Sequence, residues 1–253
     1  MNTDFDRLNG EWHVNNFTAR SLDGQVKLDI AGRSGTDNRI HMKAFIDSID
    51  ARALCALMGQ SSPALTGRLS ARGDLWGDTD VDFFASLTGK LAISAVKGTL
   101  NRFALVTRVL SFIDLKNWLS ARLPDPRING IPFDTLSATL NGTKGNFHTN
   151  DLRLSGPVME ITASGNLNVG DNTMDMVISL IPFDTINWLV RHIPIIGANL
   201  AGGSHGLVAA YFHVSGPIDN PSVVPKPITS IAEFVAKTLS LPINIIAPNT
   251  IKP

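Results

Sequence analysis

Apolar and polar residues alternate along most of this chain in short segments. Over residues 159–169 the apolar positions and one Gly fall on every second residue, and the residues between them are Glu, Thr, Ser or Asn. A period of two is typical of a strand with one buried face. The same alternation recurs at residues 26–30, 40–46, 69–75, 91–95, 136–140, 152–154 and 174–180. Because Gly-, Asn- and Asp-rich turns separate these segments, they predict an antiparallel meander.

Four other segments have helical spacing. They are residues 50–58, residues 100–123, the stretch that follows Asp184, and residues 228–241. Asp184 is placed to cap the first turn of the third helix, and prolines bracket the fourth. The chain is therefore predicted to be mainly β with a few helices. No composition shift marks a domain boundary, so residues 1–253 are interpreted as one domain.

The predicted sheet has one apolar face that must be covered, and four modest helices do not obviously cover all of it. Small residues such as Ala138, Ala163 and Gly165 lie on that face and leave room above it. The pattern allows two solutions. Either the sheet closes on itself as a packed sandwich or barrel, or it curls into a groove that something apolar occupies.

The helix predicted over residues 100–123 has an apolar arc wider than a soluble amphipathic helix needs. Trp118 lies near its end, and its basic residues outnumber the single acidic Asp114. A broad apolar arc with basic residues and Trp is typical of a helix at a membrane interface. The alternative is a helix buried on two sides within the fold. The predicted helix at 228–241 is a weaker example of the same type.

Composition removes several classes of function. Lys+Arg and Asp+Glu both number 22, so the chain lacks the basic excess of a nucleic-acid-binding protein. Cys55 is the one cysteine, which excludes an intramolecular disulfide and a Cys-based zinc site. Hydrophobic residues make up 43% and charged residues only 17% of the chain. Even so, no uncharged apolar run reaches the ~18 residues of a membrane-spanning helix.

One enzyme-like motif is present, since GGSHG at residues 202–206 matches G-x-S-x-G. That motif needs a strand before it and a helix after it, and here the predicted order is reversed. No His follows His213 to complete a catalytic triad, and the six His residues have no metal-ligand spacing. We therefore expect a turn at Ser204, and we predict no catalytic residue, no metal and no cofactor.

A series of short motifs begins at Gly98. They are GTLNR (98–102), LSFIDL (110–115), LPD (123–125), GIPFD (130–134), DLRLSGP (151–157), GNLNV (165–169) and SGPIDNP (215–221). In order and spacing, residues 98–221 resemble the C-terminal region of the AsmA-like family, the group that includes the YhdP- and TamB-type bridge-like lipid transfer proteins. Residues 1–97 fit the same architecture by pattern alone.

The resemblance implies a fold and a location. Family members form a long, curled antiparallel sheet, a taco-like β-groove, for which we expect amphipathic helices at one end. They are Gram-negative proteins of the periplasm and cell envelope, anchored in the inner membrane by an N-terminal helix. That anchor is missing from this sequence, so we expect this chain to be the C-terminal portion of a longer protein or a short relative.

The resemblance also implies a function without catalysis. We expect a β-groove module that binds or conducts phospholipid or another apolar lipid between the inner and outer membranes and supports outer-membrane integrity. We expect it to contact a membrane surface, in particular the inner leaflet of the outer membrane. The alternative is a structural or assembly factor for the outer membrane, with a closed, packed sheet and an envelope protein as partner.

Two groups of residues carry this hypothesis. The expected groove lining consists of Leu136, Ala138, Leu140, Met159, Ile161, Ala163, Leu167, Met174, Met176 and Ile178. The expected membrane-contact residues on the helices are Phe103, Val106, Leu110, Phe112, Ile113, Trp118, Ile186, Trp188 and Leu189.

Overall fold

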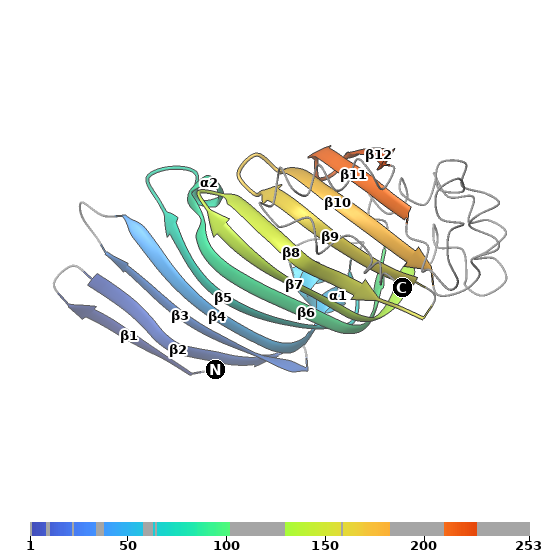
Figure 1. The fold of residues 1–253 in the computed structure, drawn as a ribbon. Helices are drawn as coiled ribbons and strands as arrows, with labels where there is room; N and C mark the ends of the chain where they lie inside the picture. Colours follow the sequence, from blue (N-terminus) through green and yellow to red (C-terminus); the bar gives the residue numbers. More distant parts are fainter. Residues whose placement is uncertain are drawn as a thin grey trace, which may run out of the picture.

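The fold is one large antiparallel sheet, seen in a computed structural model (Figure 1). The model describes residues 2–8, 11–21, 23–33, 38–57, 63, 65–101, 130–157, 159–182 and 210–226. Twelve strands follow one another in chain order: β1 (Asn2–Leu8), β2 (Glu11–Ser21), β3 (Gly24–Arg33), β4 (Arg39–Asp50), β5 (Arg68–Asp78), β6 (Thr88–Leu100), β7 (Ile131–Thr143), β8 (Asn146–Ser155), β9 (Met159–Asn168), β10 (Thr173–Pro182), β11 (Ala210–Pro217) and β12 (Ser222–Lys226).

Every neighbouring pair of strands is antiparallel, and β1 and β12 are the two edges. The sheet is therefore open, and Figure 1 shows that it is strongly curled. The mainly β, antiparallel prediction is confirmed, and each segment of alternating residues lies within one strand, except that Val169 follows the end of β9. The sheet also continues across the long connections that separate β6 from β7 and β10 from β11.

Two short helices occur among the described residues. α1 (Ala51–Leu57) confirms the first predicted helix, and the Asp50 carboxylate caps it by accepting from the N–H of Arg52 at 2.8 Å. α2 (Phe83–Ser86), between β5 and β6, was not expected from the sequence. Neither has the length to cross a bilayer. The helix predicted over residues 100–123 is wrong at its start, because Leu100 ends β6. Residues 102–123 and the predicted helices after Asp184 and in 228–241 lie outside the described residues.

The pentapeptide IPFDT occurs twice, at residues 131–135 and 181–185. The first copy is the beginning of β7. Ile181 and Pro182 of the second copy end β10, where they pair with Glu160 and Met159. The dipeptide Ile-Pro therefore begins β7 and ends β10.

Bulges bend the sheet, and polar side chains compensate for the ladder bonds lost there. The register shifts within five pairs: β1–β2, β2–β3, β4–β5, β7–β8 and β8–β9. At three of these shifts a backbone N–H donates to a side chain on the adjacent strand: Asn16 to Asp29 at 2.8 Å, Ser48 to Ser70 at 3.0 Å, and Thr139 to Asp151 at 2.7 Å. Bulges increase local twist and bending, so these shifts contribute to the curl.

The Asp151 bond gives the fold a weak dependence on acid. Burial disfavours the carboxylate, but hydrogen bonds from Thr139 and Thr149 outweigh that effect and hold the pKa of Asp151 below its ordinary value of 3.8. A lowered pKa stabilises the fold above the unfolded-state pKa, near 3.9, and that contribution is lost as pH falls through the folded-state pKa.

We therefore expect Asp151→Asn to be less stable than the parent at neutral pH, by less than about 1 kcal/mol because the side chain is exposed. Urea unfolding at neutral pH and at about pH 3 measures this difference, which should shrink in acid. A difference that stays constant with pH would show that the carboxylate charge plays no part.

Candidate functional site

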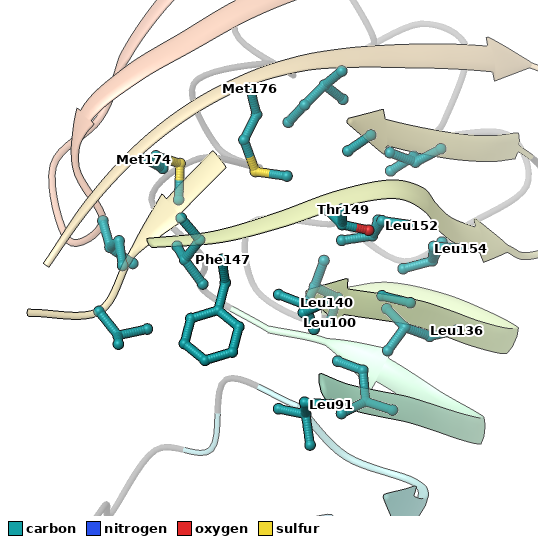
Figure 2. Close-up of a pocket in the computed structure, with 18 of the residues that line it drawn as sticks. Leu91, Leu100, Leu136, Leu140, Phe147, Thr149, Leu152, Leu154, Met174 and Met176 are labelled. Atoms are coloured by element: carbon teal, nitrogen blue, oxygen red, sulfur yellow. The ribbon is translucent and has the colours of Figure 1, made fainter. Parts of the chain in front are cut away.

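The apolar face of the sheet encloses a cavity of about 790 Å³. Side chains from β5 to β10, from α2 and from the turn after β11 line it (Figure 2). Its lining comprises Leu75, Phe84, Leu87, Leu91, Ile93, Leu100, Ile131, Leu136, Ala138, Leu140, Phe147, Thr149, Leu152, Leu154, Ile161, Ala163, Leu167, Val169, Asn172, Met174, Met176, Ile178, Leu180 and Ile218. This volume is within the range of sites that bind small ligands.

Cross-strand register builds this lining. Ile93 pairs with Ala138 on one side of the β7–β8 bulge. On the other side Leu152 pairs with Ala163, and Ala163 with Ile178, so inward side chains line up across neighbouring strands. Figure 2 shows Met174 and Met176 toward the top of the view and Leu91 toward the bottom, with Phe147 and Leu140 between them. The small Ala138 and Ala163 side chains contribute to the space in the cavity.

Nine of the ten residues that the alternation predicted as groove lining surround this cavity. They are Leu136, Ala138, Leu140, Ile161, Ala163, Leu167, Met174, Met176 and Ile178. The tenth, Met159, is completely buried in a core cluster with Ile131, Leu180 and Ala210 and is not among the lining residues. It starts β9, where it pairs with Pro182 at the end of β10.

Sequence reasoning missed several lining residues. Phe147 lies in the polar segment NFHTND, where a single aromatic residue gave no periodicity. It packs over Gly142, its partner on β7, where an added Cβ would have no room. Phe84 and Leu87 come from α2 and the residue after it. Four further lining residues were also missed: Leu91, Ile93, Leu152 and Leu154. They lie in alternating segments, so the same pattern that predicted the other lining residues could have identified them.

Three apolar clusters surround the cavity and fix its walls. Near the β5–β6 turn, Leu75, Leu87 and Phe147 pack with partly buried neighbours that include Phe83. At the opposite ends of the strands, Ala95, Phe133 and Leu154 form the second cluster. The third, on β9 to β12, includes Met176 and Val214. Because these clusters involve β5 to β12, the cavity is supported on rigid strands.

Only two of the described residues that line the cavity are polar, and both have hydrogen-bond partners. The Thr149 hydroxyl donates to Asp151 at 3.1 Å, and the Asn172 amide donates to Asp219 at 3.0 Å. No buried side-chain nitrogen or oxygen among the described residues lacks a partner. The cavity therefore presents hydrocarbon and offers no unpaired polar side chain to a ligand.

Charged and titratable side chains lie on the other face. His41 stacks on Trp76 with ring centroids 3.7 Å apart, and its Nε2 is 2.6 Å from Asp74. His213 is 2.7 Å from Asp175. Of the residues that the structure describes around the cavity, none is His, Cys, Ser, acidic or basic. Across the part of the chain that the structure describes, no group of three His, Cys, Asp or Glu side chains is arranged to hold a metal ion.

The predicted membrane-contact residues are not placed by this structure. Phe103, Val106, Leu110, Phe112, Ile113 and Trp118 lie within residues 102–129, and Ile186, Trp188 and Leu189 lie within residues 183–209, both outside the described residues. Ser204 of the GGSHG motif is in the second of these segments. Their roles stay predictions from the sequence.

Comparison with known proteins gives one match. A family model described as YhdP protein matches residues 1–223. No curated protein and no solved structure matches the chain.

Proposed function

The chain belongs to the YhdP family, and from this membership we propose that its curled sheet is a non-enzymatic module that binds lipid acyl chains. In this proposal residues 1–253 act as one β-groove module of the bacterial envelope. The module contributes to phospholipid transport between the inner and outer membranes, and thereby to outer-membrane integrity.

The apolar cavity is the observation that carries this proposal. Its hydrocarbon lining with no unpaired polar side chain suits a ligand part that is itself hydrocarbon. Each methylene moved from water into such a site contributes about 0.8 kcal/mol. A charged lipid headgroup would find no polar partner inside the cavity and would stay in water. The cavity therefore binds the acyl chains of the lipid.

The length of the cavity supports the same ligand. Met174 and Leu180 on β10 both line it, and six residues of strand span about 20 Å. The hydrocarbon core of a bilayer is about 30 Å thick, so the chains of one leaflet extend about 15 Å. An acyl chain lying along β10 therefore fits within the lined length.

The proposal excludes catalysis because general acid–base and nucleophilic steps need a titratable or nucleophilic side chain at the ligand. The described lining residues include no titratable side chain, and their one hydroxyl, on Thr149, donates to the Asp151 carboxylate. The alternative assembly factor with a closed, packed sheet is less well supported, since the described sheet is open and has an unfilled cavity. Membrane contact through Leu110 and Ile113 remains part of the proposal on sequence grounds alone.

Native mass spectrometry of the chain, purified from a Gram-negative host without added lipid, tests this function. We expect phospholipid to remain bound to the parent protein. Leu91→Glu places a carboxylate in the cavity lining and should remove the bound lipid, since an unpaired buried charge is strongly disfavoured.

The matched control is Val96→Glu on the same strand, where the side chain is 42% exposed and does not line the cavity. It should retain lipid as the parent does. A parent protein that carries no lipid, or lipid loss in both variants, would contradict binding in this cavity.

A further inference from the structure

α2 is held firmly in place at one rim of the groove. The Asp82 carboxylate caps it by accepting from the N–H groups of Phe84 at 2.9 Å and Ala85 at 3.3 Å. The Ser86 hydroxyl donates to the carbonyl of Phe83 at 2.8 Å and accepts from the N–H of Asp78 at 2.8 Å. These bonds fix a four-residue helix that would not be stable alone.

Hydrogen bonds connect the β5–β6 connection, which contains α2, to the β7–β8 turn, and the β7–β8 turn to the β9–β10 turn at the same rim. The N–H of Gly145, in the β7–β8 turn, donates to the carbonyl of Leu87 at 2.8 Å. The N–H of Val169, where the β9–β10 turn begins, donates to the carbonyl of Gly145 at 2.9 Å. Gly170 lies so close to Ala85 that an added Cβ would be 2.8 Å from its Cα. Figure 1 shows α2 at this rim, beside the ends of β7 and β8.

Neighbouring apolar side chains of this segment have different environments. Phe83 packs over Gly77 and belongs to the cluster around Phe147. Val81 is 60% exposed and does not line the cavity. Phe84 differs from both Val81 and Phe83. It lines the cavity, and 59% of its surface is also exposed to solvent. Its ring therefore lies at an opening between the cavity and water.

We propose that Phe84 is the residue that controls passage of acyl chains through this rim of the cavity. The inference rests on the proposed function. Because the capped helix and the turns hold the backbone of α2, the size of the side chain at position 84 sets the width of the opening. A smaller side chain lets a bound chain leave sooner, and a larger one retains it longer.

Release of an acyl-labelled fluorescent phosphatidylethanolamine from the loaded chain to phosphatidylcholine vesicles measures this. We expect Phe84→Ala to release the probe roughly three- to tenfold faster than the parent, and Phe84→Trp to release it more slowly, since changes at a binding surface act mostly on dissociation. Val81→Ala, in the same loop, should match the parent.

The outcomes separate the two proposals. If the parent does not take up the probe, the proposed function fails. If the parent takes up the probe but Phe84→Ala and Phe84→Trp release it at the parental rate, lipid binding stands and the role of Phe84 is overturned. The role is also overturned if Val81→Ala accelerates release as much as Phe84→Ala, because the loop as a whole would then be responsible. Opposite effects of Ala and Trp, with Val81→Ala unchanged, support it.

Discussion

Ala163→Trp and Ala138→Trp should each empty the cavity of lipid while leaving the protein folded. Both alanines line the cavity and are almost fully buried, with 7% and 4% of their surface exposed. An indole at either position would occupy space that an acyl chain needs. Displacing two or three methylenes, at about 0.8 kcal/mol each, weakens binding by about tenfold or more.

Lipid content by native mass spectrometry and the unfolding midpoint in urea should be measured together. The control is Ala92→Trp on β6, where the side chain alternates to the face opposite Ile93 and should leave bound lipid unchanged. A packed interior would respond differently, because overpacking destabilises by about 1–3 kcal/mol. Loss of stability with no change in lipid would count against an open cavity.

The sequence alone predicted the strands that line the cavity, because alternation with a period of two identifies the face as well as the strand. The alternation places two groups of residues on one face: Leu136, Ala138 and Leu140 on β7, and Met174, Met176 and Ile178 on β10. The structure brings these two groups to the same cavity. The alternation identifies the residues of the apolar face and does not identify a ligand.

The features that the sequence did not predict depend on contacts between residues distant in the sequence. β2 was not recognised because the bulge between Val14 and Phe17 interrupts its alternation. α2 has only four residues, and its stability comes from the Asp82 cap and from neighbouring turns. Met159 has the same alternation as Ile161, but neighbours at the strand end bury it completely. Periodicity gives the face of a residue and not its position along the groove.

Two glycines of the sheet differ in the room available to a side chain, although both are buried within strands. Gly165 on β9 has a φ of +146°, in the region that favours glycine, and an added Cβ would meet the carbonyl oxygen of Asp175 and lie 2.6 Å from the Cα of Met176. Gly73 on β5 has no positive φ, and its nearest neighbour would be the Leu91 side chain at 3.5 Å, an ordinary contact.

Gly165→Ala should therefore be strongly destabilising. Backbone strain at such a φ costs about 1–3 kcal/mol, and overpacking against the β10 backbone costs about 1–3 kcal/mol more. Since a domain is stable by only about 5–15 kcal/mol, we expect a much lower urea midpoint and a lower soluble yield. Gly73→Ala should stay close to the parent, since an unstrained Gly→Ala change also reduces the entropy of the unfolded chain. Equal stability of the two variants would show that β9 and β10 do not approach as closely as the register of Gly165 with Met176 requires.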